Sequence, residues 1–351
     1  MLWPETPTPW RMTGCLLLTA CLAGCQQPPL VQQERYVFGT RVQISIWGLP
    51  EALSRQEMDR VLGEMERLHR KLHAWQTSDL TRLNTAFSIG EAATIDIELR
   101  GLLQEAARYE TISDELFCPA IGMLVAEWGF HQDQPKPANP DPHVITSVVT
   151  AKPRLSDLDI SDTTVSSRNP TVQLDLGGMA KGFALDHAAA MLQKHRINNA
   201  LINIGGHVLA LGKKGNEAWK VGIQDTRRPE AMAVVELQDG EAIGTSGDYQ
   251  RYFEKDGQRY SHLIDPRSGR PAQGIRAVTV IAPKGLRAGT VSDVATKPMF
   301  IGGLDTARDY ANRFGIRDAL LVSNDGSVYI TPSLQPRLKW LLPPRHLYWL
   351  R

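Results

Sequence analysis

The chain has 351 residues, of which 42% are hydrophobic, and its formal net charge is +1. This length allows one large domain or two ordinary ones with a substantial buried core. The near-neutral charge argues against a general nucleic-acid-binding surface and against an acidic disordered chain, and no DNA- or RNA-binding motif is visible, so we expect no nucleic-acid partner.

The first 25 residues have the pattern of a secretory signal. Arg11 precedes an apolar run, Cys15 to Ala23, that is too short to cross a bilayer as a mature helix. The run leads into Leu22-Ala23-Gly24-Cys25, which is similar to the lipobox of bacterial lipoproteins, so Cys25 is expected to carry a lipid. An ordinary cleaved signal peptide is the alternative. We therefore expect a signal peptide at 1–25, a polar tether at 26–34, and a protein anchored by lipid to the bacterial cell membrane and facing the periplasm.

Hydrophobic periodicity predicts the elements of the first half. Residues 36–46 alternate as a strand, and residues 95–112 contain an amphipathic helix. Between them, Ser54 and Glu57 are spaced as a capping box before an apolar helical stripe that runs to Leu72. His69 and His73 on this helix have the spacing of a metal pair, although surface or satisfied core histidines are the favoured interpretation. Residues 75–84 are expected as a loop, and the prolines between 135 and 142 mark a long loop that serves as a lid or an insertion.

A glycine-containing turn lies at the centre of the chain. Residues 172–174 alternate like a short strand, residues 175–182 read Asp-Leu-Gly-Gly-Met-Ala-Lys-Gly, and residues 183–196 follow as a helix. Paired glycines let a backbone approach a phosphate closely, and a helix start offers free N–H groups. Lys181 adds a full positive charge, while Asp175 is placed to hold a ribose, a base edge or a metal. A tight connection without a ligand is the alternative, because both the Walker A and the dinucleotide patterns are missing.

The second half is rich in strands. Strands are predicted at 200–206, 219–223, 232–237 and 277–282, a strand running into a turn at 259–269, a polar turn at 244–249, a helix at 306–314, and a hairpin of 319–322 with 327–330. Strands outnumber helices and do not alternate strictly with them. This order favours an α+β fold with mixed or antiparallel sheets flanked by helices. The basic and aromatic tail at 333–351 is expected to pack on its own domain, with a membrane-surface role as the alternative.

Several motifs occur together in one order along the chain. They are Phe38-Gly39-Thr40, Ser78 to Asn84, Phe117 to Gly122 with Trp128-Gly129-Phe130, Asp175 to Gly182 with Asp186, Asn203 to Gly206, Gly244 to Tyr249, Tyr260 to Gly269, and Ser292-Asp293-Val294. In this combination the sequence resembles the ApbE family of FAD:protein FMN transferases. The resemblance implies an ApbE-like fold and a transferase domain at 35–332.

The resemblance also implies an activity. FAD would be split at its diphosphate, FMN would pass to a threonine hydroxyl of an acceptor protein such as a flavin-bearing subunit of a membrane redox pump, and AMP would be released with the help of Mg²⁺. The metal would be held by Asp293 and the backbone carbonyl of Gly178, with Lys297 at the position of a third ligand. Lys181 would offset phosphate charge and His262 would be the base, with Asp265 either orienting it or forming only a turn. The remaining FAD contacts implied are Phe38, Trp75, Cys118, Pro119, Ala120, Asp175 and Ile264.

Two departures from the family pattern affect the site. Phe117-Cys118-Pro119 stands where many members have Phe-Asp-Pro, so the aspartate side chain is absent. Lys297 stands where a metal-ligating threonine is often found. Either Thr296 substitutes for that threonine, or the ammonium does part of the electrostatic work of the metal. The number of metal ions therefore stays open at this stage.

Two other functions fit the same residues. An FAD pyrophosphatase would deliver water in place of the threonine, and nothing in the sequence excludes it. A lipoprotein that binds flavin without turnover would need no base at the phosphates, so His262, Asp293 and Lys181 argue against it.

Overall fold

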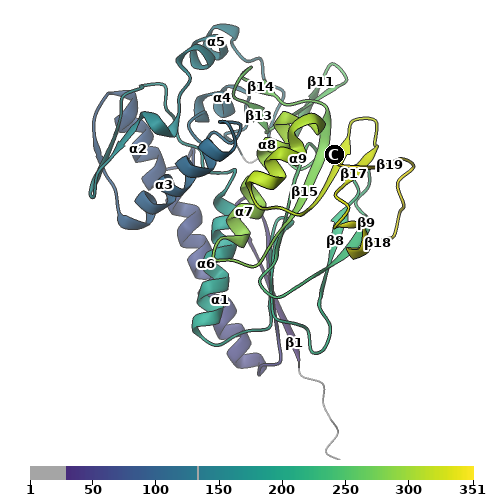
Figure 1. The fold of residues 1–351 in the computed structure, drawn as a ribbon. Coiled ribbons are helices and arrows are strands. Elements are labelled where there is room, and N and C mark those ends of the chain that lie inside the picture. The colour runs from purple at the N-terminus through teal and green to yellow at the C-terminus, as the bar shows by residue number, and fades with distance from the viewer. Residues whose placement is uncertain (1–28, 133) are drawn as a thin grey trace, which may run out of the picture.

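A computed structural model describes residues 29–132 and 134–351 and shows a nine-stranded sheet with helices on one face (Figure 1). The sheet order is β1-β2-β6-β7-β10-β15-β16-β17-β19. Neighbouring strands are antiparallel except for the parallel pair of β17 and β19. The predicted α+β class with mixed sheets is confirmed. The signal peptide and Cys25 lie outside the described residues.

The helices and strands have the following bounds. The helices are α1 (Glu51–Lys71), α2 (Asp79–Ser88), α3 (Ile97–Ile112), α4 (Gly122–Glu127), α5 (Pro142–Ala151), α6 (Ala180–Lys194), α7 (Ala288–Val294), α8 (Thr296–Gly302) and α9 (Leu304–Arg313), with short 3₁₀ turns at Leu155–Asp157 and Gln335–Arg337. The strands of the large sheet are β1 (Leu30–Val37), β2 (Thr40–Trp47), β6 (Ala200–Ile204), β7 (His207–Leu211), β10 (Ala242–Gly247), β15 (Ile275–Ala282), β16 (Asp318–Ser323), β17 (Val328–Ile330) and β19 (Leu347–Trp349). The smaller sheets use β3 (Ala93–Thr94), β4 (Leu158–Ile160), β5 (Thr164–Ser167), β8 (Trp219–Gln224), β9 (Ala231–Leu237), β11 (Tyr252–Lys255), β12 (Gln258–Ser261), β13 (Ile264–Asp265), β14 (Arg270–Pro271) and β18 (Leu338–Trp340).

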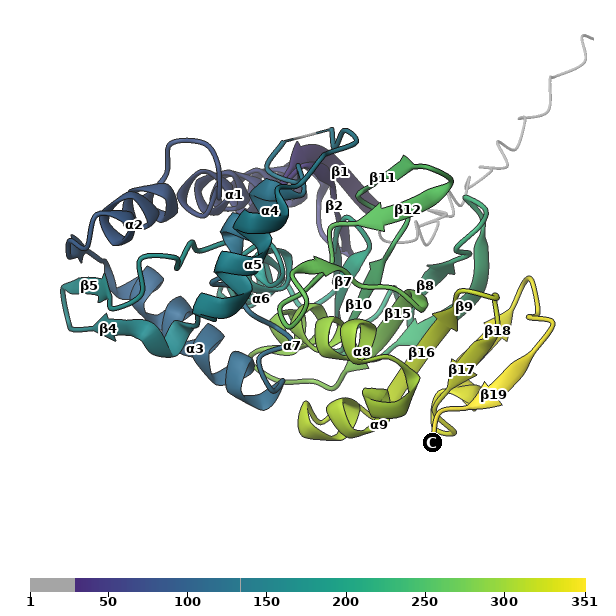
Figure 2. The same cartoon turned by 90° about the horizontal axis from the view of Figure 1, so that it is seen from above.

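The central strands are buried on both faces. In β15, Val278 and Val280 point into the cluster under the helices, whereas Ala277 and Ile281 point to the opposite cluster. The period of two along a strand explains this division. A three-stranded sheet, β18-β9-β8, covers the opposite face, so the molecule has three layers around β15 (Figure 2). This double burial explains why these strands read as continuous apolar runs.

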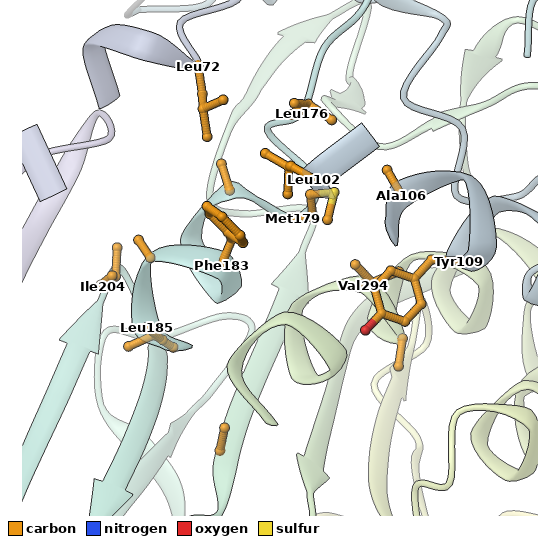
Figure 3. Close-up of a cluster of buried hydrophobic side chains, with 14 of the residues drawn as sticks. Leu72, Leu102, Ala106, Tyr109, Leu176, Met179, Phe183, Leu185, Ile204 and Val294 are labelled. Carbon is orange, nitrogen blue, oxygen red and sulfur yellow. The ribbon is translucent and has the colours of Figure 1, made fainter. Parts of the chain in front are cut away.

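Helices α6 and α7 lie in close contact because glycine stands where they meet. A Cβ at Gly182 in α6 would lie 2.7 Å from Thr290 Cα and 2.8 Å from Asp293 Cβ, so only glycine allows α6 and α7 to approach this closely. Asp186 strengthens the same contact, because its carboxylate accepts the N–H groups of Gly289 at 2.7 Å and Thr290 at 2.9 Å. Asp186 thus caps the first turn of α7. Figure 3 shows the apolar side chains around this junction, with Phe183 of α6 and Val294 of α7 facing the same cluster.

Several boundaries differ from the sequence-based expectation for local reasons. The expected strand at 36–46 is a hairpin that turns at Phe38 and Gly39, with φ of 57° and 67°. Strand β1 begins at Leu30, so residues 30–34 belong to the sheet and not to the tether. Helix α1 starts three residues before Ser54, after Pro50, and the predicted capping box is absent. The loop expected at 75–84 contains the start of α2, which is capped by Ser78.

The second half shows two further differences. Residues 172–174 pair only through one isolated bridge, Ile121 with Gln173, and are not a strand. Residues 244–247, expected as a polar turn, lie inside β10, where Gly244 packs against α7. The helix α5 was not predicted, because its β-branched sequence has weak helix propensity.

The C-terminal tail packs on its own domain. Strand β18 pairs with β9, and β19 extends the large sheet beside β17. Residues 333–351 therefore pack on their own domain, as expected, and their strands are part of the fold. In the part of the chain that the structure describes, no helix combines the length and the apolar character needed to cross a membrane.

Candidate functional site

A cavity of about 500 Å³ opens between the β1–β2 turn, the end of α1, the start of α6 and the segment that leads into β13. Most of the predicted site residues line this cavity: Phe38, Trp75, Cys118, Pro119, Asp175, Gly178, Lys181, His262, Ile264 and Lys297. They come from positions more than 250 residues apart in the sequence. The volume is in the usual range for a small-molecule or cofactor site.

Lys297 lines the cavity and forms an ion pair with Asp293, which is buried behind it. Asp293 lies in α7 with no exposed surface, and its Oδ2 accepts the N–H of Gly182 at 2.9 Å. Lys297, four residues on, donates from Nζ to Asp293 Oδ1 and to the Asp293 carbonyl oxygen at 2.8 Å. Lys297 lines the cavity and Asp293 does not, so the ammonium lies between the carboxylate and the cavity.

The contact between Asp293 and Lys297 determines the ionisation of both side chains. Burial opposes ionisation of Asp293, but nearby positive groups outweigh it and hold the pKa of this carboxyl well below its usual range. Burial lowers the pKa of the neighbouring His207 to about 3, so that ring is neutral at pH 7 and Lys297 supplies the compensating charge. Burial also lowers the pKa of Lys297, to about 8, and Asp293 opposes this shift. Lys297 therefore remains largely protonated at pH 7.

The residues present do not fit a divalent metal at Asp293. Mg²⁺ requires oxygen ligands with free lone pairs, and an ammonium can only donate hydrogen bonds. One Asp293 oxygen is bonded to Gly182 and the other to Lys297. Thr296 does not replace the expected threonine, because its fully buried hydroxyl bonds to the Asp293 carbonyl at 2.6 Å and to Ser246 at 2.7 Å. Of the expected ligands Gly178, Asp293 and Lys297, the Asp293 carboxylate is therefore bonded within the chain and the Lys297 nitrogen has no lone pair to offer, which leaves only the Gly178 carbonyl.

His262 faces the cavity with a defined tautomer. Its Nδ1 lies 3.1 Å from the carbonyl oxygen of Arg251, which can only accept, so Nδ1 carries the hydrogen and Nε2 has the lone pair. Burial, followed by the positive charges of Arg251 and Lys181, lowers the pKa of His262 to about 3. The imidazole is thus a neutral acceptor of protons at pH 7.

Asp265 does not orient His262. Its carboxylate pairs with the guanidinium of Arg267 at 2.9 Å and accepts the Arg267 N–H at 2.9 Å. Asp265 therefore stabilises its own turn, the alternative that the sequence left open. The partner of His262 is a backbone carbonyl, which sequence alone does not reveal.

One wall of the cavity combines aromatic and charged side chains. Trp75 stacks on His131 with 5.3 Å between the ring centroids, and the guanidinium of Arg251 lies 5.5 Å from the Trp75 ring. Asp175 Oδ2 lies 3.1 Å from His131 Nε2, and Oδ1 accepts the N–H of Gly177 at 2.8 Å. Burial opposes ionisation of Asp175, but His131 and Arg251 keep its pKa lowered. His131 and Arg251 were missed because no motif marks them in the sequence.

Fewer backbone N–H groups at the start of α6 are available to a ligand than the sequence predicts. The N–H of Gly177 is bonded to Asp175, that of Ala180 to the Leu176 carbonyl at 2.9 Å, and that of Gly182 to Asp293. Lys181 lines the cavity and, among the described residues, forms no ion pair with a carboxylate. The positive charge available to a phosphate here comes from Lys181 more than from the helix start.

The segment from Cys118 to Ala120 acts mainly through its backbone. The carbonyl oxygens of Pro119 and Ala120 accept the N–H groups of Asp175 at 2.8 Å and Gln173 at 3.1 Å. Ala120 is fully buried and does not line the cavity. The Cys118 thiol donates to the Pro153 carbonyl, and burial holds its pKa well above the usual value, so it is not a thiolate nucleophile.

His69 and His73 also border the cavity, but they have structural contacts. His73 Nδ1 accepts the N–H of Gln76 at 3.1 Å, and its ring lies 5.0 Å from that of His69. His69 packs edge-on against Phe38 with 5.4 Å between the ring centroids. The favoured interpretation of satisfied histidines agrees with these contacts.

A cavity lined by two lysines, a tryptophan and a neutral imidazole has the chemistry to accept an aromatic ligand that bears phosphate. Comparison with known sequences specifies the class: the ApbE family model matches residues 38–321, and the chain belongs to this family. The large mixed sheet flanked by helices is the fold shared with solved members.

Individual relatives carry consistent names. The FAD:protein FMN transferase of Rhodobacter capsulatus is 39% identical over 89% of this chain, which spans 59% of that protein's length. The FAD:protein FMN transferase of Treponema pallidum is 28% identical over 95% of this chain and 96% of its own. The crystal structure of the ApbE protein of Thermotoga maritima superposes with a TM-score of 0.78 at 27% identity, covering 88% of this chain and 99% of that one.

Proposed function

We propose that this chain is an FAD:protein FMN transferase that binds FAD in the described cavity and passes the FMN half to an acceptor protein. The observation that carries the proposal is the convergence of Lys181, Lys297 and His262 on one cavity whose wall holds a stacked Trp75. Family membership supports the same reaction.

The reaction is an exchange at phosphorus. A threonine hydroxyl of the acceptor forms a bond to the phosphorus of the FMN half, and the bond from that phosphorus to the bridging oxygen breaks. AMP leaves with the electron pair, and the hydroxyl proton passes to Nε2 of His262. No electron transfer occurs. Catalysis then consists of in-line positioning and stabilisation of negative charge on the phosphate oxygens.

The charges of the cavity suit this step. Lys181 lies in the first turn of α6 and Lys297 in the first turn of α8, and the Lys297 ammonium is held by Asp293 before the substrate arrives. In the free protein burial, and after it the surrounding cations, lower the pKa of His262. A bound diphosphate carries negative charge that offsets them, which raises the basicity of His262 when it is needed.

The Mg²⁺ expected from the family resemblance is not part of this mechanism. Both Asp293 oxygens are bonded within the chain, and the Lys297 nitrogen is a donor. No step above is routed through a metal at this position.

The location of the protein is a separate proposal. The apolar run before Leu22-Ala23-Gly24-Cys25 supports a lipid on Cys25 and a periplasm-facing position at the cell membrane. An acceptor at the same surface, such as the flavin-bearing subunit of a membrane redox pump, would be within reach of this anchor.

The proposed function is tested by one assay. The protein is incubated with FAD and an acceptor domain that carries the target threonine, and the acceptor is examined by in-gel flavin fluorescence and intact mass. A mass gain of one FMN, absent when the acceptor threonine is replaced by valine, is the expected result. Free FMN and AMP without a labelled acceptor would mean an FAD pyrophosphatase, and intact FAD would mean a flavin-binding protein.

A further inference from the structure

The Lys297 side chain occupies the position at which the carboxylate of Asp293 meets the cavity. Its stem runs beside Gly178: a Cβ placed on Gly178 would lie 3.5 Å from Lys297 Cε. The residue is 8% exposed and lines the cavity. The ammonium is therefore held on Asp293 by two hydrogen bonds and by opposite charge, in a largely buried position.

We propose that the Lys297 ammonium replaces the divalent cation at Asp293, so that this chain transfers FMN without a metal ion at that position. The inference rests on the proposed function for its reaction and on the Lys297–Asp293 contact for its geometry. It concerns the residues of this chain, in which a lysine stands where a threonine is often found in the family.

The hydrogen-bond inventory of the ammonium supports this role. An ammonium has three N–H groups, and two of them are directed to Oδ1 and to the carbonyl oxygen of Asp293. The third is left for a ligand in the cavity that Lys297 lines. A phosphate oxygen of FAD is a suitable acceptor, because charge-assisted hydrogen bonds to phosphate are short and strong.

The surroundings also resist a metal. An ion at Asp293 would have to displace Lys297 from a fully buried carboxylate and leave the ammonium beside the ion with like charge. The nearby Thr296 hydroxyl is already bonded to Ser246 and to the Asp293 carbonyl. Lys181 on the same cavity would add further repulsion.

The first experiment measures metal dependence of the wild-type protein. FMN transfer to the acceptor is compared in excess EDTA and in excess Mg²⁺, and binding of Mn²⁺ to the FAD-free protein is followed by electron paramagnetic resonance. We expect transfer rates within about twofold of each other and no stoichiometric Mn²⁺ site, since the cation is built in. Strict dependence on Mg²⁺ together with one bound Mn²⁺ would overturn the inference.

The second experiment restores the family residue. In Lys297→Thr, Asp293 regains a free oxygen and a hydroxyl neighbour, so the variant should bind one Mn²⁺ and lose about 100-fold in transfer rate in EDTA, with recovery in Mg²⁺. Lys194→Thr, at an exposed position of α6, is the matched control and should behave as the wild type. A Lys297→Thr variant that is folded, binds no Mn²⁺ and transfers FMN equally well in EDTA would show that the pair is only structural.

The two proposals fail differently. If no acceptor is labelled by the wild type or by Lys297→Thr under either condition, the transferase function is wrong. The Mn²⁺ measurement still decides the cation inference in that case, because it needs neither FAD nor acceptor. If Lys297→Thr does not fold, the wild-type comparison of EDTA with Mg²⁺ and its Mn²⁺ titration remain decisive.

Discussion

At the scale of the residue, the site depends on how each polar group is already satisfied by its neighbours. His262 is fixed as a neutral base by one backbone carbonyl, and Asp293 is fixed as a charged group by Lys297 and the amide of Gly182. Residue type alone suggested acid, base and cation, but the partners decide which atom of each is available to a ligand. The Asp265 carboxylate is bonded within its own turn, whereas the His262 ring faces the cavity and can meet a ligand.

Replacement of His262 tests its role as the base. His262→Ala should slow FMN transfer by about 10²- to 10⁴-fold, the usual span for general base catalysis, with little change in the Kd for FAD. Single-turnover labelling and FAD fluorescence titration measure the two quantities. His143→Ala, at an exposed position in α5, serves as the control. A rate for His262→Ala close to that of the wild type would remove His262 from the mechanism.

Replacement of Trp75 tests the aromatic wall. Trp75→Leu removes a ring that stacks on His131 and lies under the Arg251 guanidinium, so the Kd for FAD should rise about tenfold. Quenching of flavin fluorescence reports the affinity. Trp349→Leu, at a residue 46% exposed in β19, should leave the Kd unchanged. Equal affinities of the Trp75→Leu variant and the wild type would place the flavin and adenine rings elsewhere.

At the scale of the element, the decisive contact is the one between α6 and α7. Gly182 on α6 and Gly289 on α7 allow the helices to touch, and Asp186 caps α7. This contact sets the position of Asp293 and, through the next turn, of Lys297. The glycines of the central turn therefore serve helix packing as well as a ligand, which is why the sequence supported both interpretations.

Replacement of Gly182 tests that contact. Gly182→Ala would place a methyl group 2.7 Å from Thr290 Cα and 2.8 Å from Asp293 Cβ, so it should lower the free energy of unfolding by about 2 kcal/mol and reduce FMN transfer. Gly63→Ala in α1 is the matched control: apart from the backbone of its own helix and its chain neighbours, no described atom lies within 4 Å of the added Cβ, and better helix propensity should raise stability by about 0.5–1 kcal/mol. Urea unfolding measures both. If Gly182→Ala leaves the free energy of unfolding unchanged, the two helices can move apart without loss of stability.

At the scale of the whole molecule, burial between layers controls ionisation. His207 lies in β7 between the sheet and α7, is 1% exposed, and its Nδ1 has no hydrogen-bond partner among the described residues. Its folded pKa of about 3 lies below its ordinary value of 6.5. The unfolded chain therefore takes up a proton between these two values and the folded chain does not.

The sign of the resulting pH dependence follows from linkage. Above pH 6.5 His207 is neutral in both states and has no effect; as the pH falls below 6.5, stability is lost, by about 2 kcal/mol at pH 5. Urea unfolding of the wild type and of His207→Gln at pH 8 and pH 5 isolates this contribution. The difference between the two pH values should be smaller in the variant. An equal difference in both proteins would mean that His207 is protonated in the folded state.

Sequence periodicity and motif order were sufficient for the fold class, for most central strands and for the group of residues that meet at the cavity. These features depend on local hydrophobic patterning and on residue types, which the chain displays directly. Sequence reasoning failed where a contact between distant segments changes the meaning of a residue: Gly244 looked like a turn and is a strand position that α7 approaches closely, and the residues before Asp175 alternate but pair through one bridge only.

The sequence by itself determined that a lysine stands four residues after Asp293, and it left open whether that lysine does part of the electrostatic work of a metal. Only the tertiary structure decided where the ammonium lies, because its position depends on its hydrogen bonds to the buried Asp293 and on its place in the cavity lining. The same holds for His131 and Arg251, which no motif marks and which chain packing brings to Trp75. The physical reason is that the residue type determines which charge a side chain can carry. Its hydrogen-bond partners and its burial depend on segments far away in the chain.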